Sequence, residues 1–304
     1  MKSLQNTISI FVALLCSLSC NPVNKEPVIP PLDNIEQNIE DEEVEEENDI
    51  IEDTDNETEV ISWKNWYLSV PIDQGNGKAT SIGYEAIINN ELTEEQSKYF
   101  YLNEDSSYTL WTKFTGFTTS GLSDLGDKYC RTELREYWQG NQDTKDNWPM
   151  NTGVHILEST LQVDFVEGNG RTIVAQVHGK ESEGIDGNPA TIKIRWNSGM
   201  IQADYYTKPN DGDEWTSKYD EKLDLGRVDN EVFTFKIKIE DGKFYGALIC
   251  KEKGLNVDYS EIYDYVGNGY VHENYFKTGN YYGWNDDYEK AAQVRLYKVV
   301  TEHR

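Results

Sequence analysis

Three short segments of this chain combine cationic, hydrogen-bonding and proton-transferring side chains at every second position. They are RTELRE (131–136), QVH within RTIVAQVHGK (171–180) and YFKTGNY (275–281). Alternate side chains of a β-strand point to the same face. A strand over 171–180 would therefore place Gln176, His178 and Lys180 on one face. Cations can neutralise a carboxylate, and an imidazole or phenol can move a proton. These residue types suit a polar cleft that binds an anion.

The opposite face of the same strand is predicted to be buried. Ile173, Ala175 and Val177 alternate with the polar residues, which is typical of a strand with one face in the core. The plainer interpretation is that Gln176 and His178 belong to a solvated sheet face with an incidental histidine, as in many antiparallel sheets.

In RTELRE, alternation places Arg131, Glu133 and Arg135 on one face. A guanidinium matches the geometry of a carboxylate, and the intervening Glu133 could hold both guanidiniums in place. The alternative is a surface ladder of ion pairs, each contributing about 0–1 kcal/mol.

The third segment carries two phenols and a cation. Tyr275, Lys277, Gly279 and Tyr281 share a face if the strand is continuous. The alternative is a tyrosine-rich strand end with a bulge at the glycine.

Taken in this order, the three segments resemble the motifs of alginate lyases of polysaccharide lyase family 7. That family carries R-S/T-E-L-R, Q-I/V-H and Y-F-K-A-G-x-Y in the same order on a β-jelly roll. The resemblance covers residues 61–304. Thr278 stands where the family usually has alanine. Tyr282-Gly283 stand where many members have a residue and then glutamine. These departures concern substrate preference more than chemistry.

The resemblance implies a lyase that needs no cofactor and cleaves the 1,4-linkages of a polyuronate by β-elimination. Arg131 would neutralise the sugar carboxylate and Gln176 would hydrogen-bond it. His178 or Tyr281 would remove the proton at C5, and Tyr281 would protonate the departing O4. Whether Arg131 or Arg135 neutralises the reacting carboxylate stays open, with Arg131 favoured.

Further residues are assigned to substrate binding by the same resemblance: Glu133, Arg135, Lys180, Arg195, Tyr275 and Lys277. The expected partner is alginate, and the loops 139–152 and 205–222 are candidates for closing the cleft. Two other functions remain open. One is a lyase of the same fold acting on another polyuronate such as glucuronan, and the other is a non-catalytic polysaccharide-binding module.

Strand-like runs separated by turn signals recur along residues 61–304. They predict strands over 63–73, 108–114, 154–165, 172–178, 191–196, 232–240, 243–251 and 293–300. Asp241-Gly242 is a strong hairpin signal, and a short helix is expected within 91–100. The pattern predicts an all-β, concanavalin-like fold, a jelly roll or two-sheet antiparallel sandwich. About 244 residues suit one such domain.

The N-terminal 60 residues have a different composition. Residues 1–20 read as a bacterial lipoprotein signal, with an apolar stretch too short to span a membrane and Cys20 as the lipidated residue. Residues 33–59 hold 15 Asp or Glu and no Lys or Arg. Such a sequence predicts disorder, so 21–60 is expected to be an acidic linker. We therefore expect an outer-membrane lipoprotein exposed on the cell surface, or a secreted protein.

Charge limits the partners of the remaining domain. Of the net charge of −27, residues 61–304 keep −13, which argues against nucleic-acid binding. A polyanion-binding cleft must then be a local basic island. Its candidates are Arg131, Arg135, Lys180, Lys193, Arg195 and Lys277. The expected state is a monomer.

Cysteine and metal chemistry have little support. Cys130 and Cys250 could pair or remain two buried thiols. The histidines and cysteines lack metal-ligand spacing, and the acidic loop 210–214 is more often solvated than bound to calcium.

Overall fold

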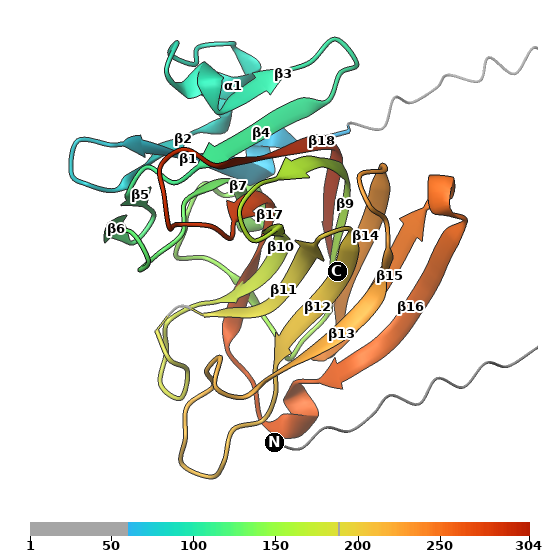
Figure 1. Cartoon of the computed structure of the whole chain (residues 1–304). Coiled ribbons are helices and arrows are strands. Elements are labelled where there is room, and N and C mark those ends of the chain that lie inside the picture. The colour runs from blue at the N-terminus through green and yellow to red at the C-terminus, as the bar shows by residue number, and fades with distance from the viewer. Residues whose placement is uncertain (1–59, 188) are drawn as a thin grey trace, which may run out of the picture. The chain divides into compact units, whose positions relative to one another are not determined.

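Two antiparallel sheets face each other in the computed structural model, which describes residues 60–187 and 189–304 (Figure 1). The predicted signal segment, Cys20 and all but the last residue of the predicted linker lie outside the described residues. The apolar faces of the two sheets form the core between them. The predicted all-β sandwich is therefore confirmed.

The first sheet carries all three sequence motifs. Its strands, in spatial order, are β13 (Asp220–Arg227), β12 (Met200–Tyr206), β11 (Ala190–Asn197), β10 (Arg171–Gly179), β17 (Glu273–Tyr282), β7 (Arg131–Glu136), β1 (Trp66–Asp73) and β2 (Ala79–Ile82). The two-residue strand β8 (Trp148–Pro149) also pairs with β17.

The second sheet backs the first. Its order is β16 (Leu255–Asp264), β15 (Lys243–Cys250), β14 (Phe233–Glu240), β9 (Val154–Val166), β18 (Ala291–His303), β4 (Tyr108–Lys113) and β3 (Phe100–Leu102). A small hairpin joins β5 (Phe117–Thr118) to β6 (Gly121–Leu122). The one α-helix among the described residues is α1 (Tyr84–Ile88). The 3-10 turns are η1 (Trp63–Asn65), η2 (Gln96–Lys98), η3 (Trp138–Gly140), η4 (Lys251–Lys253) and η5 (Val266–Asn268).

Alternating apolar residues explain why these strands form a sandwich. In β14, Phe233, Phe235, Ile237 and Ile239 are all buried, whereas the residues between them are partly exposed. Burying each such side chain contributes about 1.5–3 kcal/mol. Asp241 and Gly242 then turn the chain into β15 with φ values of 49° and 81°. Both residues adopt the left-handed backbone conformation, as the predicted two-residue hairpin turn requires.

The motif strands β10, β17 and β7 are neighbours in the first sheet. Lys277 of β17 lies opposite Gln176 on one side and opposite Arg135 on the other. Tyr281 lies opposite Arg131. Strand β17 has one extra residue against β10 between Thr278 and Tyr281 but keeps its register against β7. Tyr275, Lys277 and Tyr281 all line the cleft, so they share one face as predicted.

One prediction about β10 is wrong. Ile173 was expected to share the core face with Ala175 and Val177, but it lines the opposite, polar face. The register between β10 and β11 shifts between Ile173 and Ala175, where β10 holds one extra residue. A bulge of this kind breaks strict alternation, and Val174 packs in the core instead.

The short helix predicted within 91–100 is a single 3-10 turn, η2. Strand β3 then begins at Phe100, which is buried and pairs with Leu110 of β4. The helix α1 was not predicted, and neither were β12, β13 and β16. Cys130 and Cys250 are two separate, buried, unpaired thiols. In the described part of the chain, no helix has the length and apolar character needed to cross a membrane.

Candidate active site

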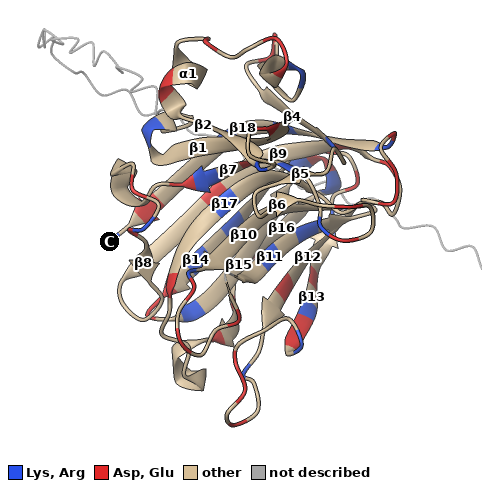
Figure 2. Ribbon diagram, turned by 90° about the vertical axis from the view of Figure 1, so that its left-hand side faces the viewer, with Lys and Arg blue, Asp and Glu red and all other residues tan. Residues whose placement is uncertain are grey.

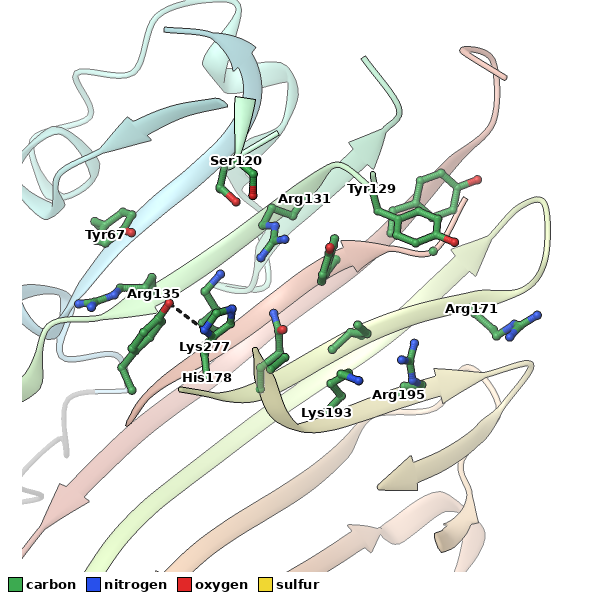
Figure 3. A pocket seen from close by; sticks show the side chains of 18 of the residues that line it. Tyr67, Ser120, Tyr129, Arg131, Arg135, Arg171, His178, Lys193, Arg195 and Lys277 are labelled. Carbon is green, nitrogen blue, oxygen red and sulfur yellow. Dashed lines mark hydrogen bonds between the residues drawn. The ribbon is translucent and has the colours of Figure 1, made fainter. Parts of the chain in front are cut away.

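The polar face of the first sheet holds a cleft of about 680 Å³ (Figure 3), a volume typical of ligand-binding sites. No Asp or Glu is among the described residues that line it. Seven cationic residues do so: Arg131, Arg135, Arg171, Lys180, Lys193, Arg195 and Lys277. Figure 2 shows Lys and Arg, coloured blue, along β7, β17, β10 and β11. The cleft is therefore the basic island that an acidic domain needs to bind a polyanion.

Glu133 organises the cations from beneath the cleft floor. Its Oε2 accepts hydrogen bonds from Arg131 Nη1 at 3.1 Å and from Lys277 Nζ at 3.0 Å. Its Oε1 accepts from Gln176 Nε2. Glu133 is only 1% exposed and does not line the cleft, so its carboxylate faces its three donors. The expectation that it holds both arginines is met for Arg131, whereas Arg135 has other partners.

Opposing effects set the protonation of this buried pair. Burial raises the pKa of Glu133, but the charges of Lys277 and Arg131 lower it by more. The pKa of Glu133 therefore lies below its ordinary value. Burial and the neighbouring Arg131 lower the pKa of Lys277 to about 8, although Glu133 acts in the opposite direction. Lys277 therefore carries its charge at neutral pH and loses it in mild alkali.

Arg135 is fixed by a neighbouring loop. Its Nη2 donates to the carbonyl oxygen of Thr144 at 2.8 Å and to Oδ1 of Asn147 at 2.9 Å. Its Nη1 donates to the carbonyl oxygen of Glu136. The guanidinium carbon lies 4.0 Å from the ring centre of Tyr275. Much of the hydrogen-bonding capacity of Arg135 is thus already used.

Arg131 has more capacity left. Its guanidinium carbon lies 3.6 Å from the ring centre of Tyr281, and its Nε has no hydrogen-bond partner among the described residues. A guanidinium has five N–H donors, and Glu133 takes one from Nη1. Arg131 can therefore bind an anion directly beside the Tyr281 phenol.

His178 is held in one tautomer. Its Nδ1 lies 3.1 Å from the carbonyl oxygen of Gly179 and 3.0 Å from the Tyr275 hydroxyl. A carbonyl can only accept, so the proton sits on Nδ1 and the lone pair of Nε2 is left available. Burial, reinforced by Lys277, holds the pKa of His178 well below its ordinary value. The imidazole is thus neutral near pH 7, as a base must be.

Tyr275 supports this arrangement. Its ring stacks on His178 with the ring centres 5.0 Å apart, and it also contacts the guanidinium of Arg135. Burial raises the pKa of Tyr275 to about 12, although Arg135 opposes this rise. The phenol therefore remains protonated and orients the imidazole.

The neighbouring strand β11 extends the basic floor. Arg195 Nε lies 2.7 Å from Oδ2 of Asp204, and Lys193 Nζ lies 3.7 Å from the same atom. Both cations line the cleft. Burial lowers the pKa of Lys193, and Asp204 counteracts it. One buried carboxylate thus positions two cations here, as Glu133 does on β7.

Lys180 follows the end of β10 and lies at the rim of the cleft. Its Nζ donates to Glu273 at 2.6 Å and to the carbonyl oxygen of Lys145 at 2.9 Å. It therefore joins the loop after η3 to the start of β17. Its charge is paired in this structure.

Sequence reasoning missed several lining residues: Tyr67, Thr119, Ser120, Tyr129, Asn169, Arg171, Ile173, Ala190, Tyr282 and Gly283. Only Tyr67 had a usable signal, since it alternates with the buried Trp66 and Leu68 in β1. Of the two candidate loops, 139–152 contributes Thr144 and Asn147, and 205–222 contributes none of the described lining residues. Residues 60–187 and 189–304 contain no group of three or more His, Cys, Asp or Glu that could hold a metal ion.

The family model described as alginate lyase matches residues 61–303. The chain belongs to this family. The match spans nearly the whole described part, including all three motif strands. No curated protein is similar enough in sequence to count as a match.

Solved structures agree with the fold. Alginate lyase A1-II', a member of polysaccharide lyase family 7, is 22% identical with a TM-score of 0.60, covering 79% of this chain and 95% of that one. Alginate lyase PA1167 from Pseudomonas aeruginosa is 18% identical with a TM-score of 0.60, covering 80% and 100%. The alginate lyase from Klebsiella pneumoniae is 19% identical with a TM-score of 0.59, covering 81% and 97%.

Proposed function

We propose that this protein cleaves alginate by β-elimination, leaving a 4,5-unsaturated uronate at the new non-reducing end. The observation that carries the proposal is the Arg131–Tyr281 pair in a cleft whose described lining residues include seven cations and no Asp or Glu. Family membership supports the substrate. A variant of the related lyase A1-II' has been solved with the substrate GGMG.

The first step is activation of the sugar at C5. The proton there is weakly acidic because the adjacent carboxylate is already negative. Arg131 neutralises that carboxylate. Gln176 has two amide N–H groups, one bound to Glu133, and the second donates to the carboxylate. These donors are in place before the reaction, so they stabilise the developing enolate dianion without reorganisation.

The second step removes the proton at C5 and protonates O4. A base removes the C5 proton, the electron pair forms the C4–C5 double bond, and the C4–O4 bond breaks. Tyr281 donates its phenolic proton to the departing O4. His178, neutral and with Nε2 free, is the base when proton and leaving group lie on opposite sides of the ring. When they lie on the same side, Tyr281 acts as both base and acid: its phenolate takes the C5 proton, and the phenol so formed gives that same proton to O4.

The remaining cations bind neighbouring sugars. Arg135, Lys277 and Arg195 come from three strands of one cleft floor, so they can meet carboxylates of successive residues in the polymer. Lys180 and Tyr275 complete the end of the cleft near His178. The phenol of Tyr275 supports binding by holding the imidazole.

Ultraviolet absorbance tests the reaction, because elimination creates a conjugated double bond and hydrolysis or binding does not. Residues 61–304 are incubated with alginate, mannuronate-rich blocks, guluronate-rich blocks and glucuronan, in parallel with a Tyr281→Phe variant. We expect absorbance to rise on alginate and Tyr281→Phe to abolish the rise. A rise in absorbance on glucuronan alone would show that the substrate is another polyuronate. A flat trace with retained binding would leave a polysaccharide-binding module.

We further propose that the enzyme acts as a monomer on the cell envelope, anchored in the outer membrane through a lipid on Cys20. The sequence supports this with an apolar segment ending at Cys20 and a highly acidic stretch over 33–59, which self-repulsion would extend. Metabolic labelling with a radioactive fatty acid tests the anchor. Label is expected on the full chain and not on Cys20→Ser. Equal labelling of both would contradict the proposal.

A further inference from the structure

A second groove lies on the outer face of the second sheet, near its edge. It has a volume of about 400 Å³ and is lined by Lys98, Tyr99, Tyr101, Trp111, Lys113 and Gln293. In β4, the buried Leu110 and Thr112 alternate with the partly exposed Trp111 and Lys113. The groove therefore opens on the side of β4 away from the core, with the core and the first sheet between it and the active-site cleft. Figure 1 shows β3 and β4 at this edge of the sheet.

Aromatic side chains form its walls. Tyr101 is 40% exposed, and Trp111 packs on Tyr99 with the ring centres 5.4 Å apart. Gln293 lies opposite Trp111 on β18. An exposed tyrosine beside a supported tryptophan offers an apolar face with polar edges, which is the surface that a sugar ring stacks on.

The charge of the groove is opposite to that of the rest of the protein. No Asp or Glu is among its described lining residues, although the chain holds 55 acidic and 28 basic residues. Most buried cations of the cleft have carboxylate partners. By contrast, neither Lys98 nor Lys113 makes an ion pair or a side-chain hydrogen bond within the described residues. Two ammonium groups without an ion-pair partner among the described residues therefore flank the aromatic wall. Burial raises the pKa of Tyr99, and the nearby acid Glu95 raises it further, so an acid also acts on the groove.

An acidic hollow marks where the groove ends. It shares Tyr101 and Gln293 with the groove, but it also contains Glu104, Asp105 and Asp164. Arg295, which lines it too, is neutralised by Asp164 at 2.8 Å. An anion is therefore attracted at the lysine end and repelled at the other, which confines binding to a short segment of a chain.

We propose that this groove is a second, non-catalytic binding site for a uronate polysaccharide, in which Tyr101 and Trp111 stack on sugar rings and Lys98 and Lys113 bind carboxylates. The proposal rests on the proposed function for the identity of the polymer. Because the groove and the cleft open on opposite sides of the sandwich, a short oligosaccharide cannot occupy both. A long chain or a gel can, and the second contact then benefits from a high effective concentration.

The test separates binding from catalysis. In a Tyr281→Phe background, affinity electrophoresis through gels containing alginate measures polymer binding for Tyr101→Ala and for Lys98→Ala/Lys113→Ala. Lys78→Ala/Lys251→Ala is the matched control, since it removes two exposed lysines that line neither site. We expect the groove variants to bind the polymer about 3- to 10-fold more weakly, in keeping with modest exposed charge contacts, and the control to be unchanged.

Activity measurements on enzyme that keeps Tyr281 complete the test. The same groove variants should raise KM on polymer and leave kcat/KM on a tetrasaccharide unchanged. Equal polymer binding by all variants would overturn the proposal, as would an equal loss in the control, which would indicate net charge alone. If the groove variants change only the oligomeric state measured by sedimentation, the groove is an interface between copies of the chain. That result would also overturn the proposal. If the enzyme fails to cleave any polyuronate but binding depends on the groove, only the proposed catalytic function fails.

Discussion

Replacing Glu133 with glutamine tests how the cleft cations are held in place. Glu133→Gln keeps the size of the side chain and removes the charge that faces Arg131 Nη1 at 3.1 Å and Lys277 Nζ at 3.0 Å. All three groups are almost fully buried. Removing one partner of a buried ion pair costs about 3–5 kcal/mol, because a buried charge is left uncompensated.

Two measurements test the loss of this charge. For a domain of this size, each kcal/mol shifts Tm by roughly 2–4 °C, so Tm should fall by roughly 10 °C. Glu133 also raises the pKa of Lys277, so its loss should move the pKa of Lys277 below about 8 and discharge it near neutral pH. Elimination should then fall at pH 7.5 more than at pH 6.

The exposed pair between Lys180 and Glu273 supplies the control. Glu273→Gln breaks an ion pair of similar length, 2.6 Å, but exposed pairs contribute only about 0–1 kcal/mol. The double variant Glu133→Gln/Lys277→Met should be more stable than the sum of its single changes, because it removes the uncompensated cation. If Glu133→Gln unfolds within about 2 °C of the parent, the buried network contributes little to the stability of the cleft.

Four further substitutions have defined outcomes. With a pKa of about 8, Lys277 loses its charge as pH rises through that value, so kcat/KM on alginate should fall there. Lys277→Arg should shift this fall to higher pH, and an unchanged profile would assign it to another group. Gly279→Ala should lower Tm by several degrees in a thermal melt, since its Cβ would lie 2.8 Å from the Thr132 carbonyl oxygen at a φ of +144° and backbone strain of this kind costs about 1–3 kcal/mol. Arg131→Lys should lower kcat in the absorbance assay, whereas Arg135→Lys should mainly raise KM, and the reverse would exchange their roles.

The sequence predicted the faces of the motif strands well where the strands are regular. Strand β7 has no bulge against β17, so Arg131, Glu133 and Arg135 share a face as alternation requires. The prediction failed at Ile173, because the bulge in β10 depends on how β11 pairs with it. Strands β13 and β16 were missed for a related reason. They lie at sheet edges and expose many side chains, so they lack the apolar alternation that marks a strand.

The sequence by itself determined the fold class, the three motif strands and the residue types that face the cleft, since these follow from alternation within each strand. Only the tertiary structure decided which charges pair. Gln176 and Lys277 bind Glu133 across 43 and 144 residues of chain, and Arg135 turns instead to the loop at Thr144 and Asn147. Local pattern carries no information about such partners, because they depend on which strands become neighbours in the sheet. That choice leaves Arg131 with more donors free for an anion than Arg135.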